Sequence, residues 1–363
     1  MRLLQKELLD DGLYQVLDEN GTPRLENWKP PFSIAELKEI YFQMVHAREA
    51  DTMAVSFQRQ GRMYTYPPNL GQEAVSAAVA AVVREKDWLV PAFRELGAWL
   101  AKGVTLKEIF LYFRGNEEAS RFSGAPRMFP ISVPIASQLP HAVGIAKAMI
   151  LKGENSVVFT FVGDGGTSEG DFHEALNFAG VWNVPLVCII QNNQFAISVP
   201  VKKQTASVNL AVKALAYGVK GIKVDGNDFF AMYDACVAAS EHARSGEGPV
   251  VIEALTYRKG AHTTSDDPSR YRTKEEEDVW EGKDPLNRLR EYLLERSGLQ
   301  EEDEKRRLEQ YRAEITRQFE EAENDAPYEL KNVFAYMYEE MPDGLVQQKN
   351  RYEKYLGWKE RQQ

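Results

Sequence analysis

Four short apolar runs that alternate with helical patterns constrain the fold of this chain more than any other feature. The runs are rich in β-branched residues and almost continuously hydrophobic, which is typical of strands buried on both faces of a sheet. They lie at residues 156–163, 184–191, 220–226 and 248–257. Because helical stretches separate most of them, the pattern predicts an α/β fold with a mostly parallel sheet flanked by helices. In such sheets, ligands bind at the carboxyl ends of the strands.

The segments before and after this alternating region predict helical extensions. An N-terminal arm ends in the proline-rich stretch WKPPFS, after which Ser33 can cap a helix. Ala- and Gly-rich helices are expected at 71–83 and 138–150. After about residue 274, heavily charged helices carry apolar stripes formed by Leu286, Leu289, Leu293, Leu308, Tyr311, Ile315 and Phe319. We therefore expect an arm and helix over residues 1–60, an α/β domain over 61–273 and a helical extension over 274–363.

Composition and charge narrow the class of partner. With 44% hydrophobic and 27% charged residues, the chain has the composition of a globular protein. Its net charge of -10 argues against nucleic acid as the main partner, and a small anionic ligand would need a local cationic pocket. The two cysteines, Cys188 and Cys236, are too few for a disulfide framework or a zinc site, so we expect both to be buried.

The sequence also predicts a protein without a membrane segment. No apolar stretch reaches the roughly 18 residues that a spanning helix needs. The first residues carry Glu7, Asp10 and Asp11, whereas a transit peptide is poor in acidic residues. We therefore expect no targeting segment and a cytoplasmic location.

The stretch GDGGTSEGDFHEALNFA, which starts at Gly163, has the composition of a ligand-binding turn. Its glycines follow the first predicted strand, and a helix is expected to start near Thr167 or Ser168. Unpaired backbone N–H groups at a glycine turn and a helix N-terminus, together with the helix dipole, suit a phosphate. Asp164 would repel that phosphate unless a cation lay between them, and magnesium is the usual oxygen-ligated cation for such a place.

The next predicted strand ends in QNNQFAIS, which brings Asn192 and Asn193 to the same edge of the sheet. Asp164, the side-chain carbonyl of Asn193 and a main-chain carbonyl just after it can supply three oxygen ligands to magnesium. Taken separately, the turn and the strand end are also compatible with ordinary structure. Their combination at successive strand ends, with 26 residues between Gly165 and Asn192, favours a metal and phosphate site.

This spacing resembles the signature for diphosphate and magnesium in thiamin diphosphate enzymes. The two quoted stretches together closely resemble the alpha subunit of the decarboxylating (dehydrogenase) component of 2-oxo acid dehydrogenase complexes, and the likeness covers about residues 38 to 340. The resemblance implies a thiamin-diphosphate-binding fold and oxidative decarboxylation of a 2-oxo acid, with acyl transfer to a lipoyl group. It also implies two kinds of partner, a beta subunit in a heterotetramer of two alpha and two beta chains, and a lipoylated acyltransferase core.

The resemblance further implies roles for individual residues. Magnesium would be held by Asp164, Asn193 and the carbonyl of Phe195, and protons would be handled by His262 with Arg258 beside it. Gly165 and Gly166 would donate N–H groups to the diphosphate, and Arg94 in FRELG would add a cationic contact. The predicted cofactor-binding residues are Phe93, Arg94, Val133, Ile135, Gly163, Asp164, Gly165, Gly166, Asn193, Phe195 and His262.

Three features of the sequence bear on this assignment. The family usually has Tyr where this chain has Phe93, so one hydrogen bond to phosphate is in doubt. A second active-site histidine of the family is absent here, because the stretch 114–130 carries arginines instead. In branched-chain members a potassium ion lies in a segment like SVPIASQLP, and the matching residues here are Ser132, Pro134, Ser137 and Gln138. The alternative for this segment is a proline-interrupted helix start.

The expected substrate is pyruvate, with branched-chain 2-oxo acids as the alternative. FPISVPIASQLPHAVG resembles bacterial pyruvate-type members, and TSDDPSRYR also resembles branched-chain ones. An acetoin-cleaving or transketolase-like enzyme and a non-catalytic phosphate-binding module stay open as further alternatives. Only one α/β block is visible, whereas a thiamin diphosphate site needs two, so the chain is expected to be inactive without a second subunit. Core or surface roles are expected for His46, His141, His173 and His242.

Overall fold

The computed structural model describes residues 12–325 and 329–362. These residues form two compact units, and the boundary between the units lies after Phe319 in the chain. The first unit contains the sheet and also the helices that follow residue 274 as far as Phe319. The second unit contains two helices of its own. The predicted three-part division of the chain stays a prediction. The acidic N-terminal residues on which the absence of a targeting segment was predicted lie outside the described residues.

The core of the first unit is a parallel sheet of five strands in the order β1-β2-β3-β7-β6, which confirms the predicted fold class. Within it, Gly163 at the end of β2 lies opposite Gln191 near the end of β3. Four strands match the predicted runs. The fifth, β1, has three residues and was not predicted, because so short a run has no recognisable alternation. The strands are β1 (Trp88–Val90), β2 (Val158–Gly163), β3 (Leu186–Asn192), β6 (Lys220–Asp225) and β7 (Val250–Leu255).

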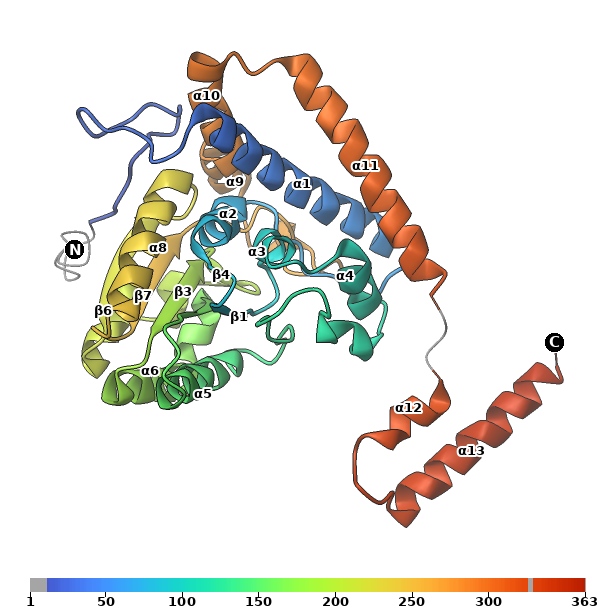
Figure 1. Cartoon of the computed structure of the whole chain (residues 1–363). Helices are drawn as coiled ribbons and strands as arrows, with labels where there is room; N and C mark the ends of the chain where they lie inside the picture. Colours follow the sequence, from blue (N-terminus) through green and yellow to red (C-terminus); the bar gives the residue numbers. More distant parts are fainter. Residues whose placement is uncertain (1–11, 326–328, 363) are drawn as a thin grey trace. The chain divides into compact units, whose positions relative to one another are not determined.

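Helices cover both faces of this sheet (Figure 1). On one face α5 (Gln138–Leu151) contacts β1, β2 and β3, and α6 (Gly170–Trp182) packs beside it with the short helix η4 (Ala211–Tyr217). On the other face α8 (Phe229–Arg244) contacts β3, β6 and β7. The helix α2 (Glu73–Val82) packs on α8. Because both faces are covered, the strands are buried along almost their whole length, as their continuous hydrophobicity predicted.

An outer layer is built from the long helix α1 (Ile34–Arg59), two short helices between β1 and β2, and the helices that follow the last strand. Ser33 caps α1 as predicted, since its side chain accepts from the Glu36 N–H and the Glu36 carboxylate accepts from the Ser33 N–H. The predicted stripe residue Phe319 stacks on Phe57 of α1 with ring centroids 3.7 Å apart. The helices of this layer are α3 (Leu96–Ala101), α4 (Leu106–Phe113), α9 (Lys274–Glu281), α10 (Pro285–Ser297) and α11 (Glu301–Glu323).

Short elements connect these layers, and two helices form the second unit. The connecting elements are η2 (Glu117–Arg121), η3 (Asp164–Ser168), β4 (Phe195–Ala196), β5 (Val199–Pro200), α7 (Val201–Gln204) and η5 (Pro268–Arg270). The second unit holds α12 (Leu330–Ala335) and α13 (Asp343–Glu360). Across the described residues, no helix combines the length and the apolar character that crossing a membrane requires.

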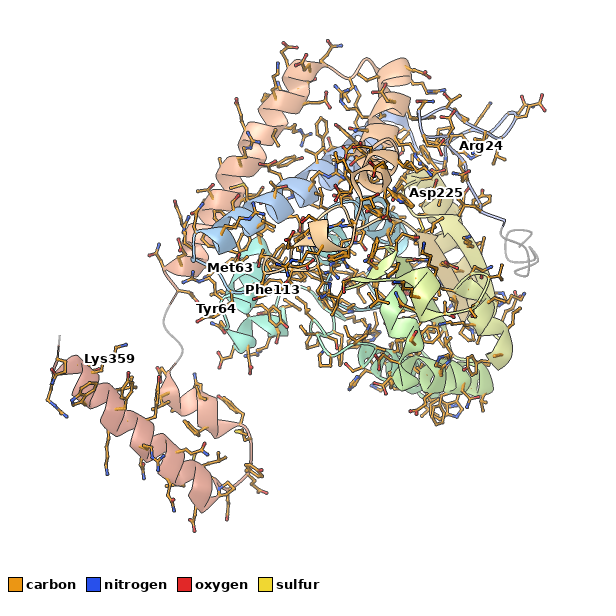
Figure 2. All side chains as sticks on the ribbon, turned by 180° about the vertical axis from the view of Figure 1, so that it is seen from behind. Arg24, Met63, Tyr64, Phe113, Asp225 and Lys359 are labelled. Atoms are coloured by element: carbon orange, nitrogen blue, oxygen red, sulfur yellow. The ribbon has the colours of Figure 1, made fainter. Side chains whose placement is uncertain are left out.

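The N-terminal arm is held at the edge of the sheet. Tyr14 forms a parallel bridge with Val224 of the edge strand β6. Asp225, labelled in Figure 2, accepts hydrogen bonds from Gln15 of the arm and from Arg288 of α10, each at 2.7 Å. The arm and α10 therefore meet at one buried carboxylate, which protects the exposed edge of the sheet.

Candidate active site

A cavity of about 250 Å³ opens at the carboxyl ends of β1, β2 and β3. This is the edge at which the sequence placed a ligand. Of the predicted site residues, all but Val133 contribute to its walls: Phe93, Arg94, Ile135, Gly163, Asp164, Gly165, Gly166, Asn193, Phe195, Arg258 and His262. The fold thus gathers residues that are up to 169 positions apart in the sequence around one space.

The glycine turn leads first into a 3₁₀ helix. The sequence predicted that a helix starts near Thr167 or Ser168, but residues Asp164–Ser168 form η3 and α6 begins only at Gly170. Side chains donate hydrogen bonds to backbone carbonyl groups of this turn. Thr167 Oγ1 donates to the Asp164 carbonyl at 2.8 Å, and Lys213 Nζ donates to the Thr167 carbonyl at 2.9 Å. These bonds satisfy the carbonyls locally and delay the regular helix.

Three groups that can offer oxygen atoms meet at the floor of the cavity. One terminal atom of the Asn193 side-chain amide lies 3.2 Å from both Asp164 Oδ1 and the Phe195 carbonyl oxygen. With the amide nitrogen at that point, Asn193 donates two hydrogen bonds. With the amide oxygen there, three oxygens face one another, an arrangement that a cation stabilises.

Asp164 is the one acidic group of this trio, and it is buried. Burial raises the pKa of Asp164 to about 6, which shows that its negative charge is poorly compensated here. Among the described residues, no cluster of three or more His, Cys, Asp or Glu side chains is placed to hold a metal. A metal at this point would therefore rely on one carboxylate and neutral oxygens, a set that suits magnesium better than zinc.

Two buried guanidinium groups also contribute to the cavity wall. Arg94 donates through Nε to the Pro68 carbonyl at 3.0 Å, and Arg258 donates through Nη1 to the Phe195 carbonyl at 3.0 Å. Within the described part of the chain, neither forms an ion pair with a carboxylate. Burial and then the charge of Arg258 lower the pKa of Arg94 to about 9. This wall therefore carries positive charge that no ion pair of the described residues neutralises, and such charge favours an anionic ligand.

His262 lies between the two arginines. Its Nδ1 is 3.2 Å from Arg94 Nη2 and 3.5 Å from Arg258 Nη1, and its backbone N–H donates to Asp266 Oδ2 at 2.8 Å. Burial, followed by the charges of Arg94 and Arg258, lowers the pKa of His262 to about 4. The imidazole is therefore neutral near pH 7, and because Nδ1 accepts from Arg94, the proton is on Nε2.

Sequence reasoning missed three buried polar side chains in the cavity wall, Gln72, Glu95 and Gln191. Each is buried and each has a side-chain atom without a hydrogen-bond partner, namely Gln72 Nε2, Glu95 Oε2 and Gln191 Oε1. Gln191 Nε2 donates to Glu95 Oε1 at 2.5 Å. Burial raises the pKa of the Glu95 carboxyl to about 8, so it is protonated at neutral pH. The sequence offered one signal, since Glu95 and Gln191 lie next to predicted site residues.

The segment SVPIASQLP, which carries the predicted cofactor-binding residues Val133 and Ile135 and the candidate potassium ligands, leads into α5. Ser132 Oγ and Ser137 Oγ are 2.8 Å apart, and Ser137 Oγ donates to the Pro134 carbonyl at 2.9 Å. Gln138 Nε2 donates to the Phe161 carbonyl at 2.5 Å, whereas its buried Oε1 has no partner. Several oxygens are thus held close together beside the cavity.

The remaining histidines and cysteines lie outside the cavity wall, as predicted. His46 is 3.7 Å from Glu314, His173 Nδ1 is 2.7 Å from Tyr217 Oη, and His242 is 3.1 Å from Glu247. The arginines that replace the second histidine do not contribute to the cavity wall either, and Arg127 pairs with Glu154 at 2.6 Å. Cys188 and Cys236 are free and buried.

Comparison with known proteins adds an independent finding. The sequence model of the family described as dehydrogenase E1 component matches residues 41–331 of the chain. The chain belongs to the dehydrogenase E1 component family. The pyruvate dehydrogenase E1 component subunit alpha of Acholeplasma laidlawii is 44% identical to it over 341 residues, covering 93% of this chain and 99% of the relative. The subunit of the same name from Mycoplasma genitalium is 40% identical over 356 residues, covering 98% and 99%.

A relative named for a different substrate is equally similar. The 3-methyl-2-oxobutanoate dehydrogenase subunit alpha of Mycobacterium tuberculosis is 44% identical over 340 residues, covering 92% of each chain. The predicted resemblance to alpha subunits of 2-oxo acid dehydrogenases is confirmed. Membership in the dehydrogenase E1 component family implies dependence on thiamin diphosphate, and the alpha-subunit type implies a beta-subunit partner.

Proposed function

We propose that this chain is the alpha subunit of a thiamin-diphosphate-dependent 2-oxo acid dehydrogenase that decarboxylates pyruvate and passes the acyl group to a lipoyl group on an acyltransferase core. The observation that carries this proposal is the proximity of Asp164, Asn193 and the Phe195 carbonyl. One terminal atom of the Asn193 amide lies 3.2 Å from Asp164 Oδ1 and 3.2 Å from the Phe195 carbonyl oxygen. These three groups would hold a magnesium ion, which would supply the positive charge that lets a diphosphate bind beside Asp164.

The groups around that point fit a diphosphate. Gly165 and Gly166 present backbone N–H groups at the turn, and Arg94 supplies positive charge that no carboxylate of the described residues neutralises through an ion pair. Phe93, whose ring lies 4.9 Å from the Arg94 guanidinium carbon, supports that cation through its π face instead of donating a hydrogen bond. Bound thiamin diphosphate supplies the nucleophilic carbon and the electron sink for loss of carbon dioxide.

The side chains of this chain then act on protons and on orientation. His262 is neutral and carries its proton on Nε2, so its Nε2–H can donate a hydrogen bond to a substrate oxygen or to a lipoyl sulfur and stabilise the charge that develops there. Arg258 holds the Phe195 carbonyl and lies beside His262, and this contact orients both groups. Ile135 is half exposed at the cavity mouth, a position suited to contact with the aminopyrimidine ring; Val133 beside it is exposed to a similar extent.

A potassium ion fits the segment at the start of α5. The hydroxyl oxygens of Ser132 and Ser137, the Pro134 carbonyl and the partnerless Gln138 Oε1 are oxygen ligands of the kind that a monovalent cation takes. Such an ion would fix the segment against the cavity. The ion would support the cofactor site and would take no part in the chemistry.

Exposed apolar side chains support the proposal that this chain binds a partner subunit. Leu151 at the end of α5 is 77% exposed, and on α6 Val181 is 73% and Phe178 47% exposed. Because large apolar side chains grouped on neighbouring helices mark interaction surfaces, we propose that this face meets another subunit in a heterotetramer of two alpha and two beta chains.

A second candidate substrate, 3-methyl-2-oxobutanoate, is supported by the name of one relative. The relatives from Acholeplasma laidlawii and Mycoplasma genitalium are named for pyruvate, and the equally similar relative from Mycobacterium tuberculosis is named for 3-methyl-2-oxobutanoate. A difference of two methyl groups shifts discrimination by about 1 to 3 kcal/mol for each carbon, so residue identity alone does not decide between them.

A substrate panel tests the proposal directly. The chain is assembled with its beta subunit and a lipoylated acceptor domain, and kcat/KM is measured for pyruvate and for 3-methyl-2-oxobutanoate with thiamin diphosphate and Mg²⁺. We expect the higher value for pyruvate and reduction of the lipoyl group. A higher value for 3-methyl-2-oxobutanoate would establish the branched-chain alternative, and decarboxylation without lipoyl reduction would favour an acetoin-cleaving or transketolase-like enzyme.

A further inference from the structure

The hairpin that carries the Phe195 carbonyl has an unfavourable backbone. The hairpin consists of β4 and β5. Two residues that are not glycine adopt positive φ here, Gln194 directly before β4 at 76° and Ile197 between the two strands at 54°. Each such residue costs on the order of 1 kcal/mol, and for a β-branched residue such as isoleucine the left-handed conformation is a clear outlier. This conformation therefore persists only if contacts from outside the hairpin hold it.

Arg258 holds one side of the hairpin. This buried side chain donates through Nη1 to the Phe195 carbonyl at 3.0 Å and through Nη2 to the Ile197 carbonyl at 2.5 Å. Hydrogen bonds from a charged donor are stronger than neutral ones. Arg258 thus fixes the first strand of the hairpin and its tip.

Gln204 holds the other side and joins the hairpin to the glycine turn. It is the last residue of α7, which directly follows the hairpin. Its Nε2 donates to the Val199 carbonyl at 2.9 Å and to Asp164 Oδ2 at 2.8 Å. Both partners are acceptors, so the amide nitrogen must face them, and its two hydrogens are sufficient for both bonds.

This double contact decides which oxygen of Asp164 is available. Oδ2 accepts from Gln204, whereas Oδ1 faces the Asn193 amide at 3.2 Å. We propose that Gln204 is a positioning residue for the divalent cation: it holds Asp164 and the β4–β5 hairpin together so that Oδ1 and the Phe195 carbonyl face one point before the cation binds. The inference rests on the proposed function, because it takes the cation site as given.

The physical reason is preorganisation. A cation that had to order the hairpin and rotate the carboxylate when it binds would lose binding free energy to that ordering. Gln204 would act through Asp164 and the hairpin and would not itself be a ligand of the cation. Its removal should therefore weaken the binding of Mg²⁺ more than it weakens the contacts to the diphosphate.

The test uses Gln204→Met, which keeps the length of the side chain and removes the donor. With the chain assembled with its beta subunit, thiamin diphosphate is held constant and Mg²⁺ is titrated by isothermal titration calorimetry. We expect the half-saturating Mg²⁺ concentration to rise about tenfold in Q204M, with thiamin diphosphate affinity at saturating Mg²⁺ within about threefold of wild type. Lys203→Ala, on the same short helix and exposed, serves as the matched control and should leave the Mg²⁺ titration unchanged.

The outcomes separate the inference from the proposed function. An unchanged Mg²⁺ titration in Q204M would overturn the positioning role, as would an equal loss of cofactor affinity at saturating Mg²⁺ together with a lowered unfolding temperature. Absence of Mg²⁺-dependent thiamin diphosphate binding in the wild type would instead overturn the proposed function. Gln204→Asn, whose amide is one methylene further away, should lie between wild type and Q204M.

Discussion

A Cβ atom added to Gly165 would lie 2.5 Å from the Cβ of Ala196, so the glycine turn and the β4–β5 hairpin are in direct contact. These two segments carry Asp164 and the Phe195 carbonyl, two of the three oxygen groups of the proposed cation site. The absence of a side chain at Gly165 is therefore what lets the two groups approach each other.

Gly165→Ala should force the turn and the hairpin apart. We expect Mg²⁺-dependent thiamin diphosphate binding to weaken by at least about tenfold, or 1.4 kcal/mol, because the oxygen groups no longer face one point. Calorimetric titration of the assembled enzyme measures this. Adding Ala196→Gly removes the clashing Cβ and should recover part of the loss. If the double variant bound no better than G165A, the steric explanation would be wrong.

Asp164→Asn should abolish the metal dependence of cofactor binding while the fold is retained. The variant removes the carboxylate charge from the proposed site, and we expect affinity to fall by about a hundredfold or more, or 2.7 kcal/mol. Because burial raises the pKa of Asp164 to about 6, its ionised form destabilises the folded state near pH 7. The unfolding temperature of D164N without cofactor should therefore equal or exceed that of wild type. Binding within about threefold of wild type would refute the metal assignment.

His262→Ala should slow transfer to the lipoyl group by on the order of a hundredfold, the usual effect of losing one hydrogen-bond donor aimed at the reacting atoms. Thiamin diphosphate affinity should remain within about threefold, since Arg94 and the glycine turn are unchanged. Single-turnover reduction of a lipoylated domain gives the rate, and calorimetry gives the affinity. Equal transfer rates in variant and wild type would show that His262 is an ordinary loop residue with no role in the transfer.

The His262 ring should also titrate at unusually low pH in the enzyme without cofactor. Burial and the neighbouring charges of Arg94 and Arg258 lower its pKa to about 4, so the ring is neutral above that value. NMR of labelled histidine side chains should give a midpoint well below 6.5 for His262 in the wild type. Replacing Arg94 with Gln removes one of the depressing charges and should move the midpoint upward; a midpoint near 6.5 in the wild type would contradict the geometry.

Glu95→Gln should change the pH dependence of stability. The pKa of the Glu95 carboxyl is raised from 4.5 to about 8 in the folded chain, so the folded state binds a proton more tightly than the unfolded state. The wild type should therefore lose stability relative to E95Q as pH rises from about 4.5 to 8, by at most about 1.4 kcal/mol for each pH unit. Urea unfolding midpoints of both proteins at pH 5 and pH 8 measure this. Midpoints that change in parallel would show that Glu95 is ionised throughout.

The isolated chain should show no decarboxylation with thiamin diphosphate and Mg²⁺. Its cavity is lined by groups for a diphosphate and a cation, whereas the described chain contains a single parallel sheet and presents exposed apolar side chains such as Leu151 and Val181 on one face. Activity should appear when the beta subunit is added in equal amount. Full activity of the chain alone would contradict the half-site interpretation.

The sequence by itself determined four of the five strands of the sheet and the sheet edge at which the candidate site residues meet. Continuous runs of β-branched residues identify buried parallel strands, because burial on both faces leaves no polar alternation. Parallel strands have their carboxyl ends at one edge, so Asp164 and Asn193 could be placed together from local pattern alone. The capped start of α1 at Ser33 was likewise predictable, since a capping box involves residues only three positions apart.

Only the tertiary structure decided how these groups are held and charged. The bond from Gln204 to Asp164 joins residues 40 positions apart, and that from Gln191 to Glu95 joins residues 96 positions apart. Neither pair has a periodic signal, because each depends on how β1, β2, β3 and the hairpin pack. The neutral states of His262 and Glu95 depend on burial and on neighbouring charges that the fold brings together. Local pattern specifies where a strand ends, whereas the contacts and desolvation that set the reactivity of its residues arise only when distant segments meet.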